Sequence, residues 1–446
     1  MPIIPLECPF CGAGLNINSE HDAALCNACG KPFVVKDAIV KNYISNNITI
    51  TAETLNVASQ KDFVIRGGVL TQYQGEAIDV TIPENVIKID EYAFCDTLVR
   101  NVFILNAVET VMFKGCPNLS NVVLAPGVKT IEFRDCEALS DILLPEGVVT
   151  AIFSHCNGLK EITLPASVKD FSFSCCSGLE SVKISDGISE IKENALAGCS
   201  SLKNVYISNN LNKIGEYAFS DCSSLETIIL PDSITSIGAN VFSRCSKLKS
   251  ITLSKNITTI PGSCFGECSS LKDVKLPLKL SSINSSAFYN CKKLEKIVIP
   301  QGVKVIPQHA FYGCSRLKEI TLPNSLTKID DNAFDECSSL NGISPLPNSL
   351  KVIGEYAFSC CTSLTEIYPL TGVTLYRNAF FGCKRLSSVD YHYSPNIDSS
   401  VFEGTAYKEQ QRQWYNSDKC FCCGTKYGLF SYLCKKCGKQ RPTYFS

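Results

Sequence analysis

Histidine is scarce in this sequence, with four occurrences among 446 residues. His21, His155, His309 and His392 are scattered, and none lies in a His-Glu-x-x-His motif or in a Ser/His/Asp order with a supporting motif. No glycine-rich phosphate loop precedes a helix either. These absences exclude the common hydrolytic and phosphoryl-transfer motifs, and the sequence predicts a protein that is not an enzyme.

Net charge and long apolar runs are also missing. The 42 Lys and Arg residues balance 43 Asp and Glu residues, so composition gives no global indication of a nucleic-acid or acidic partner. No stretch approaches the roughly 18 apolar residues that span a bilayer, and residues 1–8 have neither the basic residues nor the apolar run of an export signal. We therefore expect no membrane insertion and a cytoplasmic location.

Cysteine, in contrast, is abundant, with 26 residues. Eight form four Cys-x-x-Cys pairs near the two ends. Thirteen form a ladder with intervals of 20 to 24 residues: Cys116, Cys136, Cys156, Cys176, Cys199, Cys222, Cys245, Cys268, Cys291, Cys314, Cys337, Cys361 and Cys383. Stacked strands about 4.8 Å apart hold such cysteines parallel, with Cβ atoms further apart than the roughly 3.8 Å of a disulfide. We interpret the ladder as buried, unreactive free thiols and the compartment as reducing. Cys95 does not fit the spacing, and the register of its turn stays open.

The ladder cysteines are followed by a recurring apolar set. After Cys222 this set is Leu225, Ile228, Leu230, Pro231, Ile234, Ile237 and Phe242. Such a period predicts a mainly β solenoid of about 14 turns, in which each turn buries its apolar face against its neighbours. The turns are of two main lengths, 20 and 23 residues, with one of 24 and one of 22 at the end of the ladder. We expect the longer ones to hold an extra turn before the phenylalanine, and the second strand of the shorter ones to continue in its place.

The full phrase is Leu-x-x-Ile-x-Leu-Pro-x-x-Val-x-x-Ile-x-x-x-Ala-Phe-x-x-Cys-x-x-Leu, and it resembles the BspA-type (treponemal) leucine-rich repeat over roughly residues 82–404. The resemblance implies a right-handed, horseshoe-like β-solenoid used for protein binding. Some exported relatives of bacterial and protist origin are adhesins.

The first strand of each turn, Leu-x-x-Ile-x-Leu, alternates between inward and outward positions. The outward positions vary from turn to turn, as a tailored contact surface and an unconstrained solvent face both would. As candidate partner-binding residues we select Asn204, Tyr206, Thr227, Ile229, Ser250, Thr252, Asp273, Lys275, Lys296, Val298, Glu319 and Thr321. We call these twelve residues the first-strand stripe.

Residues 1–36 predict a structural zinc ribbon. Cys8, Cys11, Cys26 and Cys29 form two Cys-x-x-Cys pairs, each followed by glycine. Four thiolates at this spacing suit the tetrahedral preference of Zn²⁺ and leave no open position for catalysis. The metal would supply much of the folding free energy of so small a module.

Residues 419–446 repeat this pattern and predict a second structural zinc ion. Cys420, Cys423, Cys434 and Cys437 are the expected ligands, and Cys422 is spare. Residues 404–446 carry eight Lys and Arg residues against two acidic ones. Candidate phosphate contacts are Lys435, Lys436, Lys439 and Arg441. A basic, solvated face explains the same charges.

The remaining segments connect and close the solenoid. Residues 37–62 are expected to be a connector whose strand-like part, 42–51, either lies on the solenoid end or offers an edge for self-association. Residues 63–94 predict an N-terminal cap hairpin around Gly67-Gly68 and the first repeat phrase, and residues 95–404 the solenoid. Residues 405–418 predict a capping helix with Tyr407, Gln411 and Trp414 on one face.

Taken together, these features predict a non-enzymatic protein-binding scaffold with structural zinc at both ends. One alternative is a nucleic-acid-associated adaptor that docks through the basic C-terminal ribbon, and a second is an exported, adhesin-like binding protein. The identity of the partner, the oligomeric state and the binding face of the solenoid are not determined by the sequence.

Overall fold

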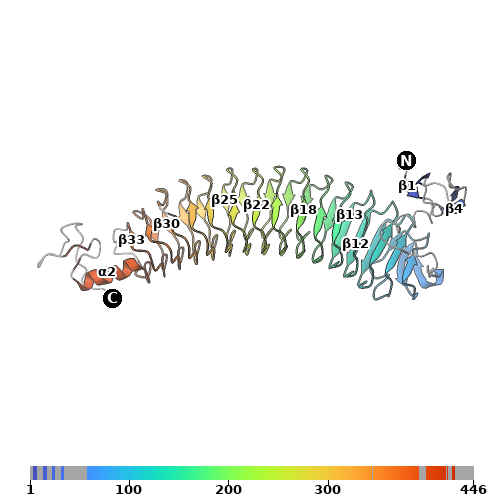
Figure 1. Cartoon of the computed structure of the whole chain (residues 1–446), viewed down its shortest axis with the longest axis horizontal. Coiled ribbons are helices and arrows are strands. Elements are labelled where there is room, and N and C mark those ends of the chain that lie inside the picture. The colour runs from blue at the N-terminus through green and yellow to red at the C-terminus, as the bar shows by residue number, and fades with distance from the viewer. Residues whose placement is uncertain are drawn as a thin grey trace. The chain divides into compact units, whose positions relative to one another are not determined.

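The computed structural model describes residues 58–343, 345–390 and 398–417, four short N-terminal strands, Lys419 and residues 424–426. The chain forms two compact units, Met1–Val148 and Val149–Ser446, here called unit 1 and unit 2. In each unit, strands of successive turns lie side by side (Figure 1). No helix in this described part is long and apolar enough to cross a bilayer.

Unit 1 begins with two antiparallel hairpins. Their strands are β1 (Ile4–Glu7), β2 (Gly14–Ile17), β3 (Ala23–Leu25) and β4 (Pro32–Val34). β1 pairs with β2, and β3 pairs with β4. The connector predicted for 42–51 lies outside the described residues.

The cap of unit 1 begins with the 3-10 helix η1 (Gln60–Asp62), followed by the antiparallel strands β5 (Phe63–Arg66) and β6 (Val69–Tyr73). Gly67 and Gly68 connect them with positive φ angles of 54° and 79°, which glycine adopts without strain. The antiparallel hairpin thus lies in the segment where the sequence predicts the cap.

Beyond the cap, three successive turns of unit 1 each contribute a first strand to one sheet and a second strand to another. The first strands are β7 (Asp79–Thr81), β9 (Asn101–Ile104) and β11 (Asn121–Leu124). The second strands are β8 (Lys88–Ile89), β10 (Thr110–Lys114) and β12 (Thr130–Arg134), and they follow β6 in parallel register. The first-strand order is β11-β9-β7.

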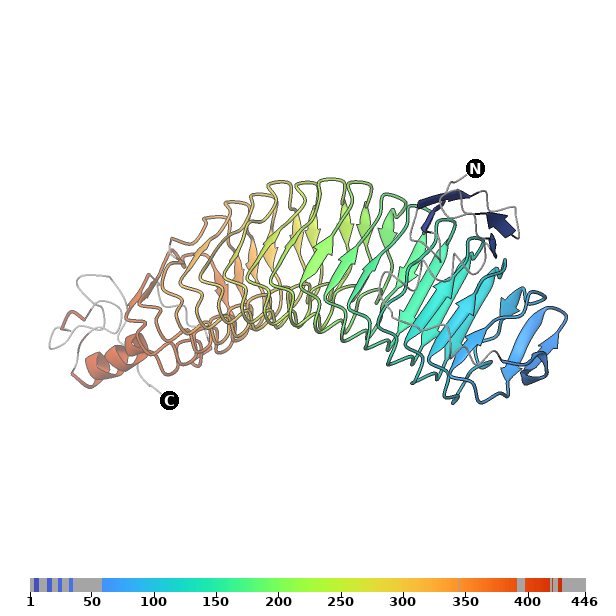
Figure 2. The same cartoon turned by 45° about the vertical axis from the view of Figure 1, so that its right-hand side comes forward.

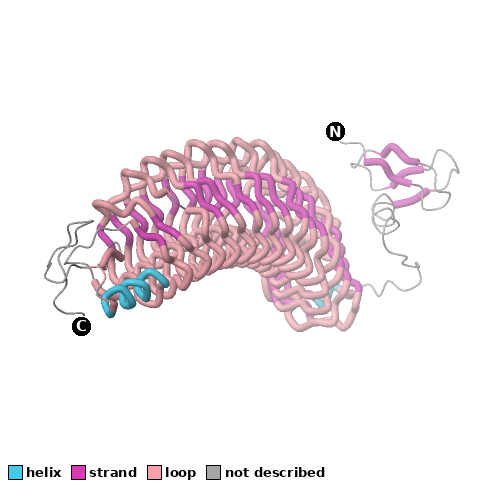
Figure 3. Tube along the Cα trace, turned by 60° about the vertical axis from the view of Figure 1, so that its left-hand side comes forward, coloured by secondary structure: helices cyan, strands magenta, loops and turns pink. Residues whose placement is uncertain are grey.

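Unit 2 continues the same pattern with parallel pairs throughout its described sheets. Its first strands are β14 (Glu161–Thr163), β16 (Ser181–Lys183), β18 (Asn204–Tyr206), β20 (Thr227–Ile229), β22 (Ser250–Thr252), β24 (Asp273–Val274), β26 (Lys296–Val298), β28 (Glu319–Thr321), β31 (Glu366–Ile367) and β33 (Ser388–Val389). Its second strands are β13 (Thr150–Ser154), β15 (Asp170–Ser172), β17 (Glu190–Ile191), β19 (Lys213–Ile214), β21 (Ser236–Ile237), β23 (Thr259–Ile260), β25 (Ser282–Ile283), β27 (Val305–Ile306), β29 (Lys328–Ile329), β30 (Val352–Ile353) and β32 (Thr374–Leu375). The helix α2 (Ala406–Asn416) follows the last turn (Figure 3).

The two turn lengths differ where the sequence predicts. In the 20-residue turns the second strands β12 and β13 run for five residues and β15 for three, and the long arrows of this region are visible in Figure 2. In the 23-residue turns the second strand is two residues long and a turn follows it. That turn contains a left-handed residue, such as Tyr217 at φ 54° or Asn240 at φ 56°. The predicted extra turn is therefore confirmed.

An aromatic column forms the centre of each core. In unit 1, Tyr73, Phe94, Phe113 and Phe133 stack with centroids 5.2 to 5.3 Å apart. In unit 2 the column from Phe219 to Phe402 stacks at 5.1 to 5.8 Å. The inward aliphatic residues around these rings are buried. The chain has about 15 turns, slightly more than the 14 that the repeat phrase predicts. Tyr73 of the cap hairpin stacks in the same column although its segment lacks the phrase.

The cysteine ladder does more than fill space. Cys199, Cys245, Cys291 and the equivalent cysteines of later turns place Sγ 3.0 to 3.2 Å from a phenylalanine carbonyl oxygen of the preceding turn. Each thiol therefore donates a hydrogen bond across the stack, a role that the prediction of purely apolar packing missed. All cysteines between Cys95 and Cys383 are free.

The structure also determines the register around Cys95. The backbone N–H of Thr97 donates to the carbonyl of Phe94 (3.3 Å), as that of Cys176 does to Phe173 (3.2 Å). Thr97 therefore occupies the ladder position of its turn, and Cys95 lies outside the ladder.

Candidate binding surface

The first-strand stripe lies wholly on the surface of unit 2. All twelve of its residues are exposed, while the residue between each outward pair is buried or half-buried. In β20, for example, Ile228 is buried and lies between the exposed Thr227 and Ile229. The structure thus makes every selected side chain accessible to a partner.

Parallel pairing aligns the stripe in two rows. Thr227, Ser250 and Asp273 are paired along one row, and Ile229 pairs with Thr252 in the other. Further along, Lys296 of β26 is directly opposite Glu319 of β28. The rows thus present small hydroxyl and β-branched side chains, with charged side chains at one end.

The second row contains the most apolar part of the stripe. Tyr206 is 60% exposed and Ile229 is 70% exposed, and they occupy equivalent positions in consecutive turns. Val298, three turns further on, is 63% exposed. Covering these two side chains with a partner would remove their apolar surface from water and so favour binding.

Ion pairs border the stripe on the side of the leading leucines. Lys203 contacts Glu180 at 2.7 Å, and Lys249 contacts Glu226 at 2.6 Å. The hydrogen bond from each lysine lowers the pKa of its glutamate partner. These charges neutralise one another in pairs, so they give the border little net charge.

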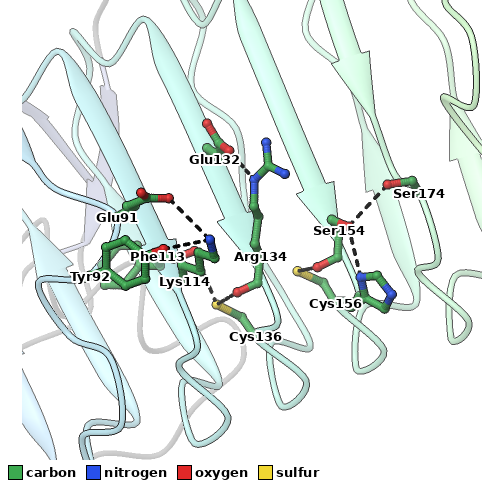
Figure 4. Close-up of polar contacts among 11 residues, drawn as sticks. Glu91, Tyr92, Phe113, Lys114, Glu132, Arg134, Cys136, Ser154, Cys156 and Ser174 are labelled. Atoms are coloured by element: carbon green, nitrogen blue, oxygen red, sulfur yellow. Dashed lines mark hydrogen bonds and ion pairs between the residues drawn. The ribbon is translucent and has the colours of Figure 1, made fainter.

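The second strands form another polar surface, which the sequence reasoning did not select (Figure 4). In unit 1, Lys114 Nζ lies 2.8 Å from Tyr92 Oη and 3.8 Å from Glu91, and the hydrogen bond with Tyr92 raises the pKa of Lys114. On the next second strand, β12, Arg134 pairs with Glu132 of the same strand. In unit 2, Ser154 Oγ is 3.3 Å from Ser174 Oγ. The polar side chains of this surface thus contact each other in small separate groups.

An open groove of about 400 Å³ lies along the turns after the aromatic column in unit 2. Its lining is polar: Arg244, Ser246, Glu267, Ser269, Asn290 and Lys292. Arg244 lies 3.6 Å from Glu267 and 3.9 Å from Asp221. The sequence signal for this groove is weak, because its residues occupy the variable position before the ladder cysteine and the position after it.

Comparison with known protein families identifies the repeat. A family model described as "BspA type Leucine rich repeat region (6 copies)" matches residues 72–172, 128–245, 166–295 and 281–408. The chain belongs to this family. Members of the BspA-type family are generally non-enzymatic binding proteins, so the prediction that this chain is not an enzyme is confirmed.

Solved structures resemble this BspA-type chain over most of its length. A leucine-rich repeat protein from Bacteroides ovatus is 28% identical, with a TM-score of 0.54, and the match covers 77% of this chain and 94% of that one. A "leucine rich cell surface protein" from Faecalibacterium prausnitzii is 25% identical, with a TM-score of 0.45, covering 71% and 95%. Comparison with curated proteins finds no match.

The other predicted sites of this BspA-type chain lie outside the described residues. These are the zinc ligands Cys8, Cys11, Cys26, Cys29, Cys420, Cys423, Cys434 and Cys437 and the phosphate contacts Lys435, Lys436, Lys439 and Arg441. Within the described residues, no group of three or more His, Cys, Asp or Glu side chains is placed to hold a metal ion.

Proposed function

We propose that the protein is a scaffold that binds a protein partner through the first-strand stripe, with Tyr206 and Ile229 at the centre of the contact. The observation that carries the proposal is the exposure of these two apolar side chains on adjacent turns. Interfaces draw most of their binding free energy from a few large side chains that become fully desolvated, surrounded by a polar rim. Thr227, Thr252 and the paired charges of Lys203 and Lys249 form such a rim.

A pulldown, in which the protein captures its partner from a lysate of the cells that naturally produce it, tests this surface. Ile229→Asp and Tyr206→Ala are expected to weaken partner capture by tenfold or more, because each removes an apolar anchor and the first adds a charge that the interface must desolvate. The matched control is Ser236→Asp, which changes an exposed residue on the second strand of the same turn. Equal loss in the control, or no loss in the two variants, would reject the stripe as the binding surface.

We also propose structural zinc in the N-terminal module. Support comes from the registers of its two hairpins. Glu7 pairs with Gly14 and Leu25 pairs with Pro32, so six residues connect the strands in each hairpin. In both connections the first and fourth residues are cysteines and the fifth is glycine. Two such connections supply the four thiolates of a closed zinc site.

The same proposal extends to the C-terminal module. Lys419 forms an antiparallel bridge with Lys426, which again leaves six residues in between. Cys420 is the first of these, Cys423 the fourth and Gly424 the fifth, with φ 68°. This spacing favours Cys420 and Cys423 over Cys422 as ligands. Cys434 and Cys437 would complete the four thiolates.

Native mass spectrometry of the full chain, purified without added metal, tests both zinc sites. We expect two zinc ions per chain, one after Cys8→Ser and one after Cys423→Ser. Cys422→Ser is the matched control and should retain both. An unchanged metal content in either ligand variant would remove that cysteine from the proposed ligand set.

Two further experiments, on the location of the protein and on the nuclease and salt sensitivity of its complex, distinguish the alternative functions. We propose a cytoplasmic location, and recovery of the protein from the cell surface would instead favour the adhesin-like function. The nucleic-acid adaptor predicts that nuclease strips the captured partners and that salt weakens binding steeply. It also predicts loss of capture after charge removal at Lys435, Lys436, Lys439 and Arg441. Nuclease-resistant capture that depends on Ile229 supports the scaffold.

A further inference from the structure

We propose that the partner of this protein is an acidic polypeptide, and that an acidic segment of it docks on a patch of lysines beside the first-strand stripe. The proposal rests on the scaffold function proposed above and adds the charge of the partner. The patch belongs to unit 2 and consists of six exposed residues, here called the lysine patch: Lys247, Lys272, Lys275, Lys292, Lys293 and Lys296.

Charge is distributed unevenly along the solenoid. The three turns spanning residues 245–313 carry ten lysines against three acidic residues, whereas the whole chain carries 42 Lys and Arg against 43 Asp and Glu. A chain that is nearly neutral overall therefore has one strongly basic segment. Such a segment creates a local positive potential that attracts partners of the opposite charge.

The acidic residues of these three turns offset little of this charge. Glu267 lies 3.6 Å from Arg244, and Glu295 lies 3.3 Å from Lys318. Both of these basic residues lie outside residues 245–313, so the two glutamates are already neutralised by neighbouring turns. Asp273 is the one acidic residue left to offset the lysines.

The ion pairs along the border of the stripe leave out Lys272. Glu226 pairs with Lys249 at 2.6 Å in the turns before it, and Glu295 pairs with Lys318 in the turns after it. Lys272 lies between these two pairs and forms no ion pair with any described residue. Its backbone N–H donates to the carbonyl of Lys249 at 3.2 Å, so two lysines are neighbours across adjacent turns. Like charges in this arrangement repel each other.

The other five members of the lysine patch also form no ion pair within the described part of the chain. Lys296 pairs in register with Glu319, but the two side chains make no ion pair. A partner that supplies carboxylates would therefore gain new charge contacts and also reduce the repulsion among the lysines.

The lysine patch is continuous with the first-strand stripe. Each of its residues lies within seven positions after the ladder cysteine of its turn, and successive strands are about 4.8 Å apart. Lys275 and Lys296 belong to the stripe itself, and Lys292 also lines the polar groove. A single partner can therefore contact the stripe and the lysine patch together.

Exposed apolar side chains within this region favour a polypeptide as the occupant. Val298 is 63% exposed and occupies the position of Lys275 in the next turn. Leu278, three residues after Lys275, is 91% exposed. A polypeptide segment that combines carboxylates with apolar side chains matches both the charge and these apolar groups.

Fluorescence anisotropy with the purified full chain tests the charge of the partner. The probe is a labelled peptide of glutamate with leucine at every fourth residue. We expect the triple variant Lys272→Gln, Lys275→Gln and Lys293→Gln to bind this peptide about tenfold more weakly, because it removes three exposed charge contacts. Raising the salt concentration should weaken binding to the parent more than to the variant.

The matched control removes the same charge elsewhere. Lys129, Lys304 and Lys351 are exposed, and each immediately precedes a second strand. Their triple substitution by glutamine should leave peptide affinity unchanged. An equal loss in both triple variants, or no loss in either, would overturn the lysine patch as the docking site.

A second probe tests the class of partner. An oligothymidylate of equal charge replaces the peptide. We expect the peptide to bind more tightly, and Val298→Ser to weaken the peptide about threefold or more while leaving the oligothymidylate unchanged. Tighter binding of the oligothymidylate, insensitive to Val298→Ser, would overturn the polypeptide assignment in favour of nucleic acid.

The pulldown described above separates this inference from the scaffold proposal. Loss of capture in both Ile229→Asp and the patch triple variant supports both. If Ile229→Asp loses the partner and the triple variant keeps it, only the acidic docking is overturned. If both variants keep the partner, the scaffold proposal fails and the inference fails with it.

Discussion

The thiol of Cys268 donates a hydrogen bond to the carbonyl oxygen of Phe242 in the preceding turn, with Sγ and O 3.0 Å apart. The same oxygen accepts the backbone N–H of Cys245 at 3.1 Å. The thiol therefore uses the second lone pair of a buried carbonyl, which explains why a small side chain with a donor suits this position better than a purely apolar one.

Substitutions at Cys268 test this bond. Threonine and valine have nearly the same shape, but only threonine keeps a donor. We expect Cys268→Val to be less stable than Cys268→Thr by about 1 kcal/mol, the usual net contribution of a hydrogen bond. Urea midpoints compare the two variants. A valine variant at least as stable as the threonine variant would show that the thiol acts by packing alone. Threonine already occurs at this position in the turn of Thr97.

Thiol reactivity should divide the cysteines by burial. Burial raises the pKa of Cys199 and Cys314 to about 12. At pH 8 their thiolate fraction is then about one in ten thousand, so alkylation of the folded chain should be very slow. Among the cysteines from Cys95 to Cys383, Cys175 is the exposed one and should react first. Peptide mapping after a short iodoacetamide pulse measures each site, and urea should abolish the difference. Rapid labelling of Cys199 in the native chain would contradict the burial of the ladder.

The aromatic column should tolerate leucine better than alanine. Phe288 stacks on Phe265 at 5.3 Å and on Phe311 at 5.2 Å. Phe288→Ala opens a cavity between two turns and should cost about 3–5 kcal/mol, whereas Phe288→Leu fills most of that space and should cost less than half as much. Leu196 already occupies an equivalent buried position. Denaturant unfolding compares the variants, and an alanine variant as stable as the leucine variant would contradict the prediction.

The ion pairs at the border of the stripe predict a small acid sensitivity. Hydrogen bonds from Lys203 and Lys249 lower the pKa of Glu180 and Glu226 below the ordinary value of 4.5. A carboxyl whose pKa is lower in the folded state stabilises that state above pH 4.5, and the contribution disappears as pH falls through the folded pKa. In the double variant Lys203→Gln and Lys249→Gln, the loss of stability as pH falls below about 4.5 should be smaller, because the folded-state pKa of each glutamate returns toward its ordinary value.

Salt provides the control for the acid experiment. These four side chains are exposed, so 1 M salt should largely remove the difference between the parent and the double variant. The readout is the urea midpoint at each pH. If the urea midpoints of the parent and the double variant fall in parallel as the pH is lowered at low salt, the two ion pairs contribute nothing to the pH dependence.

Much of the solenoid was predictable from the spacing of a few residues. A period of 20 or 23 residues with inward Leu, Ile and Phe can bury its apolar side chains only by stacking turn on turn, so the repeat implies the parallel sheets. The alternation in Leu-x-x-Ile-x-Leu likewise placed Thr227 and Ile229 on the surface. Members of the column without the phrase, such as Tyr73, were missed because a turn at the end of the array need not repeat it.

The sequence by itself determined the architecture of this protein, the family to which it belongs and the outward direction of the first-strand stripe, because all three depend on local periodicity. Only the tertiary structure decided which groups meet between turns. The bond from Cys268 to Phe242 joins residues 26 positions apart and depends on how successive turns stack, as do the stacked rings of the aromatic column. Their geometry follows from three-dimensional packing, which spacing along the chain does not specify.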